Sequence, residues 1–156
     1  MEDKKQKIIS YIIIISSILF VAILGSVFVN LGMNWFNGLR KPSEFVPNIL
    51  IPIVWTIIYS IFAVVLCLWV SKQELSKKMI VLLIVNGVLN ILWCLIFFTL
   101  QQKLLGLVAI ILLLIMAYVL VLEIKKTNKL YYYLTAIYPI WVSIATTLNL
   151  ALWILN

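Results

Sequence analysis

Residues 79–100 read MIVLLIVNGVLNILWCLIFFTL, and this uncharged, apolar stretch decides the fold class. A helix needs about 20 predominantly apolar residues to cross the hydrocarbon core of a bilayer. A run of this length with no charge therefore predicts a transmembrane helix.

Four further uncharged runs lie on either side of this stretch. They predict spans at residues 8–29, 49–70, 104–122 and 131–153, with one long connection at residues 30–48. The first run is too long for a signal peptide and no small-residue cleavage site follows it, so we expect it to be retained. The chain is thus predicted to be a single all-α membrane domain, residues 1–156, folded as a five-transmembrane-helix bundle.

The composition supports the same fold class. Of the 156 residues, 65% are hydrophobic and 11% charged, and the mean hydropathy is +1.20, whereas soluble domains are about half apolar and a quarter charged. The net charge of +7 comes from basic clusters between the apolar runs, which favours a role in topology and argues against nucleic-acid binding. There is no His, and Cys67 and Cys94 have no metal-type spacing and are expected to lie too far apart for a disulfide. We expect neither a metal nor a required cofactor.

The basic residues also predict an orientation. An odd number of spans places the two ends of the chain on opposite sides, and the positive-inside rule then assigns the more basic side to the cytoplasm. We predict a cytoplasmic N-terminus, an external C-terminus and an external loop 30–48, in a bacterial cell membrane. The N-terminal side carries Lys4, Lys5, Lys7, Lys72, Lys77, Lys78, Lys125, Lys126 and Lys129, and the other side carries Arg40, Lys41 and Lys103.

One face of the 79–100 span is polar and aromatic. Asn86, Asn90, Trp93 and Phe97 follow offsets of 0, 4, 7 and 11, which puts them on the same side of a helix. Amides near the middle of a bilayer are costly when they face lipid. We expect the two Asn side chains to point inward, either as interhelical hydrogen bonds or as ligand contacts.

Two other spans carry matching stripes. Trp55 and Tyr59 share a face of span 49–70, and Trp141 and Ala145 share a face of span 131–153. Trp55, Trp93 and Trp141 are predicted to lie deeper than an interfacial aromatic belt, which favours an aromatic-lined pocket, with plain core packing as the alternative. The belt interpretation fits Trp35, Trp69, Trp153 and Tyr131–Tyr133.

The 30–48 connection is richer than a simple linker. It combines aromatic, cationic and proline residues, which predicts a rigid amphipathic lid over the outer mouth of the pocket. Its residues of interest are Trp35, Phe36, Arg40, Lys41, Pro42, Ser43, Glu44, Phe45 and Pro47.

These blocks, in this order, resemble the TspO/MBR family, the tryptophan-rich sensory proteins that include the mitochondrial translocator protein, or peripheral-type benzodiazepine receptor. The resemblance covers nearly the whole chain. It rests on Trp35-Phe36, Leu39, Lys41-Pro42-Ser43, Trp55, Tyr59, Asn86, Asn90, Trp93, Phe97-Phe98, Tyr138, Trp141, Ala145, Leu148 and Asn149.

The chain departs from the family pattern in three places. Glu44 stands where the family usually has Trp, and a single Pro47 replaces a double proline. Pro139 follows Tyr138 instead of preceding it, which is expected to move the local kink. The C-terminal cholesterol-recognition segment of the mammalian proteins is absent, so the resemblance does not extend to cholesterol transport.

The resemblance implies a homodimer that binds porphyrins such as protoporphyrin IX, and benzodiazepine-type ligands, in a pocket within the bundle. It implies a role in tetrapyrrole traffic or stress sensing. Trp55, Trp93 and Trp141 would stack on the macrocycle and the loop cations would meet its carboxylates, while the lack of His favours metal-free porphyrin over haem. The predicted ligand-binding residues are Trp35, Phe36, Arg40, Pro42, Trp55, Tyr59, Asn86, Asn90, Trp93, Trp141 and Ala145.

Two other functions are weighed against this receptor. An enzyme that degrades porphyrin oxidatively, with or without light, would have to use Trp55 and Trp141 as redox partners, because the spans hold no acid–base pair or activated nucleophile. A small proton-coupled drug exporter would need a buried carboxylate in its first helix, and residues 8–29 contain none. The sequence favours a receptor over both.

Overall fold

The computed structural model describes residues 2–43, 46–72 and 75–156, with side chains from residue 4 onward. The regular structure of these residues is helical, and five of its segments are long and apolar enough to cross a membrane. The predicted fold class is confirmed. The helices are α1 (Glu2–Gly38), α2 (Leu50–Lys72), α3 (Lys77–Cys94) with the π-helical turn η1 (Leu95–Thr99), α4 (Lys103–Thr127), α5 (Lys129–Thr135) and α6 (Ile137–Leu155).

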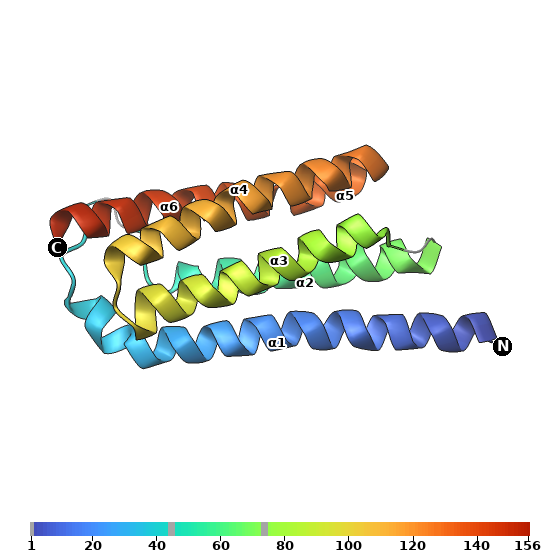
Figure 1. The fold of residues 1–156 in the computed structure, drawn as a ribbon, viewed down its shortest axis with the longest axis horizontal. Coiled ribbons are helices and arrows are strands. Elements are labelled where there is room, and N and C mark those ends of the chain that lie inside the picture. The colour runs from blue at the N-terminus through green and yellow to red at the C-terminus, as the bar shows by residue number, and fades with distance from the viewer. Residues whose placement is uncertain (1, 44–45, 73–74) are drawn as a thin grey trace.

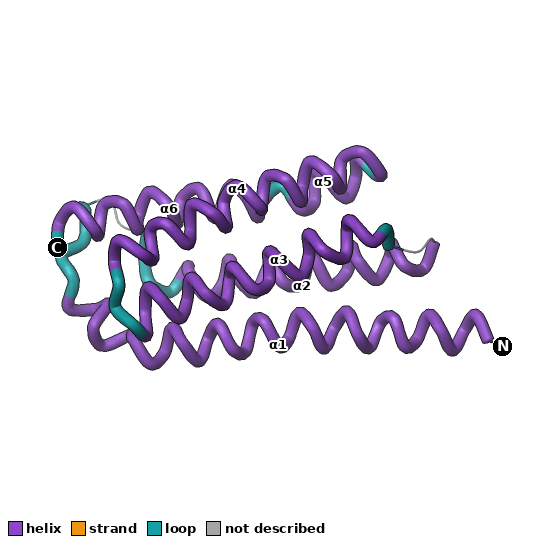
Figure 2. Tube along the Cα trace, in the orientation of Figure 1, coloured by secondary structure: helices purple, strands orange, loops and turns teal. Residues whose placement is uncertain are grey.

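The helices run side by side as a bundle (Figures 1 and 2). In Figure 1, α1 forms one side, α4 with α5 and α6 forms the other, and α2 and α3 lie between them. Large apolar side chains cover the outside, among them Ile12 and Phe20 on α1, Ile84 on α3 and Ile115 on α4. Such a surface is unfavourable in water and suits lipid tails. The chain is an integral membrane protein.

The two ends of the bundle differ in charge. The N-terminus, the α2–α3 connection and the α4–α5 connection lie at one end, and the C-terminus lies at the other with the α1–α2 and η1–α4 connections (Figure 1). The nine lysines assigned by sequence to the N-terminal side therefore gather at one end. Cys67 and Cys94 are free, as predicted.

Helix α1 is longer than its predicted span. The sequence suggested a break from Asn30, but the helix continues to Gly38. Its last turns are amphipathic, because Asn30 and Asn34 are exposed while Gly32 and Phe36 are buried. The asparagines therefore mark the polar face of a helix, and Trp35 and Phe36 belong to that helix and not to a loop.

A backbone contact fastens the C-terminal half of α1 to η1. A Cβ built on Gly32 would meet the Phe98 carbonyl oxygen at 2.0 Å, so only glycine permits this approach. The Thr99 hydroxyl donates to the Phe28 carbonyl oxygen at 2.8 Å across the same contact. In the described part of α1 the buried positions are Gly25, Gly32 and Phe36, all in this half. The N-terminal half packs more loosely.

The last span is kinked. The sequence predicted one helix over residues 131–153, whereas α5 ends at Thr135 and α6 begins at Ile137. Pro139 has no N–H to donate to the Thr135 carbonyl, and the next bond, from Ile140 N to Ala136 O, is stretched to 3.5 Å. The kink therefore follows from the position of the proline.

The aromatic residues at the lysine-rich end are only partly interfacial. The rings of Trp69 and Tyr131 lie 5.8 Å apart, and both side chains are buried. The belt prediction was wrong for these two, because α5 packs against the end of α2 and encloses them. Tyr133, at the same end, and Trp153, at the opposite end near the C-terminus, are exposed.

Candidate functional site

Three indoles from different helices meet in the half of the bundle that holds the C-terminus. The ring centroids of Trp55 on α2 and Trp93 on α3 are 6.2 Å apart. Both residues line one small cavity with Trp141 and Ala145 of α6. The predicted convergence of the three tryptophans is therefore found.

The space between these indoles is nearly filled. Its volume is about 40 Å³, which suits about one water molecule. Phe36 contributes to the filling, with its ring 5.2 Å from that of Phe98, and Phe97 lies 4.9 Å from Phe98. The expectation of an open slot between the three indoles was wrong, because the helical end of α1 inserts Phe36 there.

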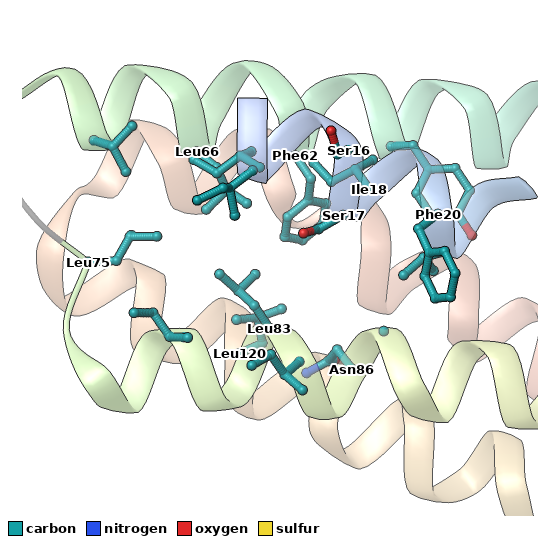
Figure 3. A pocket seen from close by; sticks show the side chains of 18 of the residues that line it. Ser16, Ser17, Ile18, Phe20, Phe62, Leu66, Leu75, Leu83, Asn86 and Leu120 are labelled. Carbon is teal, nitrogen blue, oxygen red and sulfur yellow. The ribbon is translucent and has the colours of Figure 1, made fainter. Parts of the chain in front are cut away.

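A much larger cavity lies between α1, α2 and α3, toward the lysine-rich end of the bundle. Its volume is about 1190 Å³, which is above the usual range for ligand sites, about 300–1,000 Å³. Figure 3 shows Phe62 and Leu66 of α2 facing Leu83 and Asn86 of α3 across it. This cavity has room for a large ligand.

Trp55 separates the two cavities, since it lines both of them. It stacks on Tyr59, one helical turn later, with ring centroids 5.6 Å apart and an interplanar angle of 27°. Tyr59 also lines the large cavity. The inner end of that cavity is therefore an aromatic wall made by consecutive turns of α2.

The two predicted asparagines have different roles. The Asn86 amide donates to the Leu82 and Met116 carbonyl oxygens at 2.8 and 3.2 Å, and its Oδ1 accepts from the Tyr138 hydroxyl at 3.2 Å. Asn86 thus holds α3 to α4 and α6. It also lines the large cavity.

Asn90 keeps hydrogen-bonding capacity. Its Oδ1 accepts from the Tyr59 hydroxyl at 3.2 Å, but its Nδ2 makes no hydrogen bond to any described residue. Asn90 lines the large cavity beside the aromatic wall. Its amide is a free donor at the place where a ligand would meet Trp55 and Tyr59.

Trp141 supplies a second unused donor. Its indole Nε1 is buried and has no partner among the described residues, although buried polar groups normally have one. Trp93, by contrast, donates to Asn149 Oδ1 at 3.2 Å. Of the two buried indoles that line the small cavity, Trp93 therefore has a hydrogen-bond partner and Trp141 has none among the described residues.

The loop after α1 lies over the end of the aromatic cluster that is nearer the C-terminus. The backbone N–H of Arg40 donates to Asn156 Oδ1 at 2.8 Å, and Asn156 Nδ2 donates back to the Arg40 carbonyl oxygen at 3.0 Å. The Lys41 ammonium lies 4.6 Å from the centre of the Phe36 ring. Trp35 meets Phe97 edge to face at 5.5 Å. Pro42 follows Lys41 in this loop, while Glu44 and Phe45, also predicted to form the lid, lie outside the described residues.

The geometry and the order of the tryptophan blocks agree with a comparison against known proteins. A model of the TspO/MBR family matches residues 13–154. The chain belongs to this family.

Two of the relatives of this TspO/MBR protein cover it almost completely. It is 33% identical to the tryptophan-rich protein TspO of Chlorobaculum tepidum, over 97% of this chain and 98% of the relative. It is 30% identical to the protein of that name from Archaeoglobus fulgidus, over 97% and 99%. It is also 30% identical to protein CrtK of Rhodobacter capsulatus, over 78% of each chain. The resemblance inferred from the motifs is confirmed.

The sequence interpretation of this TspO/MBR protein missed the residues on α1 that line the large cavity. Gln6, Ser10 and Ser17 all line it. Their offsets of 0, 4 and 11 place them on one face of the N-terminal half of α1, as the offset of 4 places Asn86 and Asn90 on one face of α3. That signal was available in the sequence.

Proposed function

We propose that this membrane protein is a receptor for porphyrins, such as protoporphyrin IX, and for benzodiazepine-type ligands. The observation that carries the proposal is the Trp55–Tyr59 wall at the inner end of a cavity of about 1190 Å³. A flat π-system gains about 0.5–1.5 kcal/mol from each well-placed aromatic partner, beyond the burial of its area. The free Asn90 amide beside the wall would orient the ligand.

A bound macrocycle would lie with one face on Trp55 and Tyr59. The aromatic cluster separates the large cavity from the loop that carries Arg40 and Lys41. Because Trp55 lines both cavities, the carboxylates of the ligand would reach these two cations once Phe36 moves aside. The released space would expose the Trp141 indole N–H as a further donor. Binding needs no cofactor, since the porphyrin is itself the ligand.

The test is a titration of the purified protein with protoporphyrin IX, followed by the absorbance of the porphyrin. Trp55→Phe should weaken binding by up to about tenfold, because the smaller Phe ring keeps only part of an aromatic contact worth about 0.5–1.5 kcal/mol. Trp153→Phe is the matched control, because this indole is exposed on the outside of the bundle and should leave the affinity unchanged. Equal affinity of the wild type, Trp55→Phe and Trp141→Phe would refute the site.

Analysis of the porphyrin recovered from the protein separates a receptor from an enzyme. Mass analysis of porphyrin recovered after incubation in light and in darkness should return the unaltered compound. A product that disappears in Trp55→Phe and Trp141→Phe would instead identify a porphyrin-degrading activity.

We also propose a cytoplasmic N-terminus and an external C-terminus in a bacterial cell membrane, with a role in tetrapyrrole traffic or stress sensing. The nine basic residues at one end of the bundle, against three at the other, support this orientation. The family supports a homodimer, which light scattering with correction for bound detergent would detect as twice the mass of the chain.

A further inference from the structure

The large cavity ends in positive charge at the lysine-rich end of the bundle. Gln6 and Lys7 of α1 and Lys72 of α2 line it there. Both lysines are exposed, and they belong to the end of the bundle that carries most of the basic residues. A long apolar cavity therefore opens at a mouth with two cations.

The cavity is somewhat longer than the hydrocarbon of one membrane leaflet. It follows α1 from Lys7 to Val21, which corresponds to about 21 Å at 1.5 Å per residue. One leaflet contributes about 15 Å of hydrocarbon. Ser17 and Phe62 project into the cavity from α1 and α2 (Figure 3). An extended acyl chain would fit along it.

The cavity is also open to the side. Phe20 of α1 and Ile84 of α3 both line it and are 63% and 60% exposed. The N-terminal half of α1 therefore leaves a lateral opening toward α3, on the surface that faces lipid. A lipid could enter from its own leaflet while its headgroup stayed at the membrane surface.

The charges at the mouth favour an anionic headgroup. Among the residues whose side chains the structure describes, Glu123 is the only acidic one. It pairs with Lys78 and Lys126, both at 2.9 Å. Within the described side chains, Lys7 and Lys72 have no carboxylate partner. Basic pockets between transmembrane helices on the cytoplasmic side are typical sites for anionic lipid headgroups.

We propose that this cavity binds one anionic glycerophospholipid. Its phosphate lies at the mouth with Lys7 and Lys72, the Gln6 amide donates to its oxygens, and one acyl chain runs past Ser17 and Phe62. The lipid site meets the aromatic wall only at its inner end. It shares the large cavity with the proposed porphyrin site, but its headgroup contacts at Lys7 and Lys72 are separate from the aromatic wall.

The test uses the full chain, purified in mild detergent, stripped of lipid and observed by native mass spectrometry. Dioleoyl phosphatidylglycerol should be retained about tenfold better than dioleoyl phosphatidylcholine, whose chains are identical and whose headgroup is neutral overall. The variant Lys7→Gln/Lys72→Gln should lose this preference. Lys125→Gln/Lys129→Gln is the matched control, because it removes two charges from the same end of the bundle outside the cavity, and it should keep the preference.

A second variant tests the path of the acyl chain. Ser17→Phe fills the cavity from an exposed position on α1 and should lower retention of both lipids several-fold, whereas Ser17→Ala should not. Glycerol phosphate added in excess should not compete, since it lacks chains. Three results would each overturn the proposal: no preference in the wild type, equal loss in the two lysine pairs, or full retention in a folded Ser17→Phe protein.

Discussion

The indole Nε1 of Trp93 donates a hydrogen bond to Oδ1 of Asn149 at 3.2 Å, and both side chains are buried. The bond joins α3 to α6 beside the small aromatic cavity. Lipid tails are as apolar as the helices, so packing and polar contacts of this kind hold a membrane bundle together. Asn149 also donates to the Ala145 carbonyl oxygen of its own helix at 2.9 Å.

Replacing Asn149 with Leu should destabilise the protein. The Trp93 N–H would remain buried without an acceptor, at a cost of about 1–3 kcal/mol. The measurement is unfolding of the purified protein by denaturing detergent. Trp93→Phe in the same background removes the orphaned donor, so the double variant should be less destabilised than the sum of the single changes. Additive effects would show that the two residues are not coupled.

Gly32→Ala should prevent the close contact of α1 with η1. The new methyl group would lie 2.0 Å from the Phe98 carbonyl oxygen, which belongs to the backbone and cannot rotate away. We expect little folded protein, seen as loss of the monodisperse peak in size-exclusion chromatography. Gly38→Ala is the control on the same helix, because a Cβ there meets no atom within 4 Å. Normal folding of Gly32→Ala would contradict the packing described for this contact.

The turn after η1 offers a stabilising substitution. Gln101 has φ 57°, in the left-handed region, which costs a non-glycine residue about 1–2 kcal/mol. Gln101→Gly should therefore raise stability by about 0.5–1 kcal/mol after the extra freedom of the unfolded chain is subtracted. Gln102→Gly, at φ −90°, should give no gain in the same thermal unfolding assay. If both variants are destabilised, the left-handed conformation is not a source of strain.

The sequence predicted the parts of the fold that depend on composition and helical period. Uncharged runs located the spans, and offsets of 3 and 4 placed Trp55, Asn86 and Trp93 on inward faces. The end of α1 was misjudged because Asn30 and Asn34 resemble a polar break when read in order, whereas on a helix they form one exposed face over the buried Gly32 and Phe36.

The position of the cavity could not be predicted in the same way. It depends on how closely α1 approaches its neighbours along its length, and that distance is set by the Gly32 contact with η1 at one end and by looser packing at the other. The way in which Phe36, Phe97 and Phe98 together fill the space between the indoles likewise depends on how the helices pack against one another. Helical period says which side chains point inward, but it does not say how much room they leave.

The loop after α1 should control ligand exchange through Asn156. Its side chain accepts from and donates to the Arg40 backbone, and the Lys103 ammonium donates to the Asn156 backbone oxygen at 2.6 Å. Asn156→Ala should release the loop and speed both binding and dissociation of porphyrin in stopped-flow mixing, with the equilibrium affinity changing less than either rate. Lys103→Gln removes the Lys103–Asn156 hydrogen bond but keeps both bonds between Asn156 and Arg40. It should therefore change the two rates less. Unchanged rates in Asn156→Ala would mean that the ligand does not pass this loop.

The distribution of lysines predicts which end of the bundle faces the cytoplasm, and single cysteines can test it. In a Cys67→Ser background, where the remaining Cys94 is buried, Thr127→Cys and Gln102→Cys place exposed thiols at opposite ends without changing the charge. A membrane-impermeant maleimide applied to intact cells should label residue 102 and spare residue 127, which should react only after the membrane is opened. Because the positive-inside rule acts through short basic connections, adding lysines to the η1–α4 turn should weaken this preference. Labelling of residue 127 in intact cells would show that the bundle has the opposite orientation. The lysine-lined mouth of the large cavity would then lie in the outer leaflet.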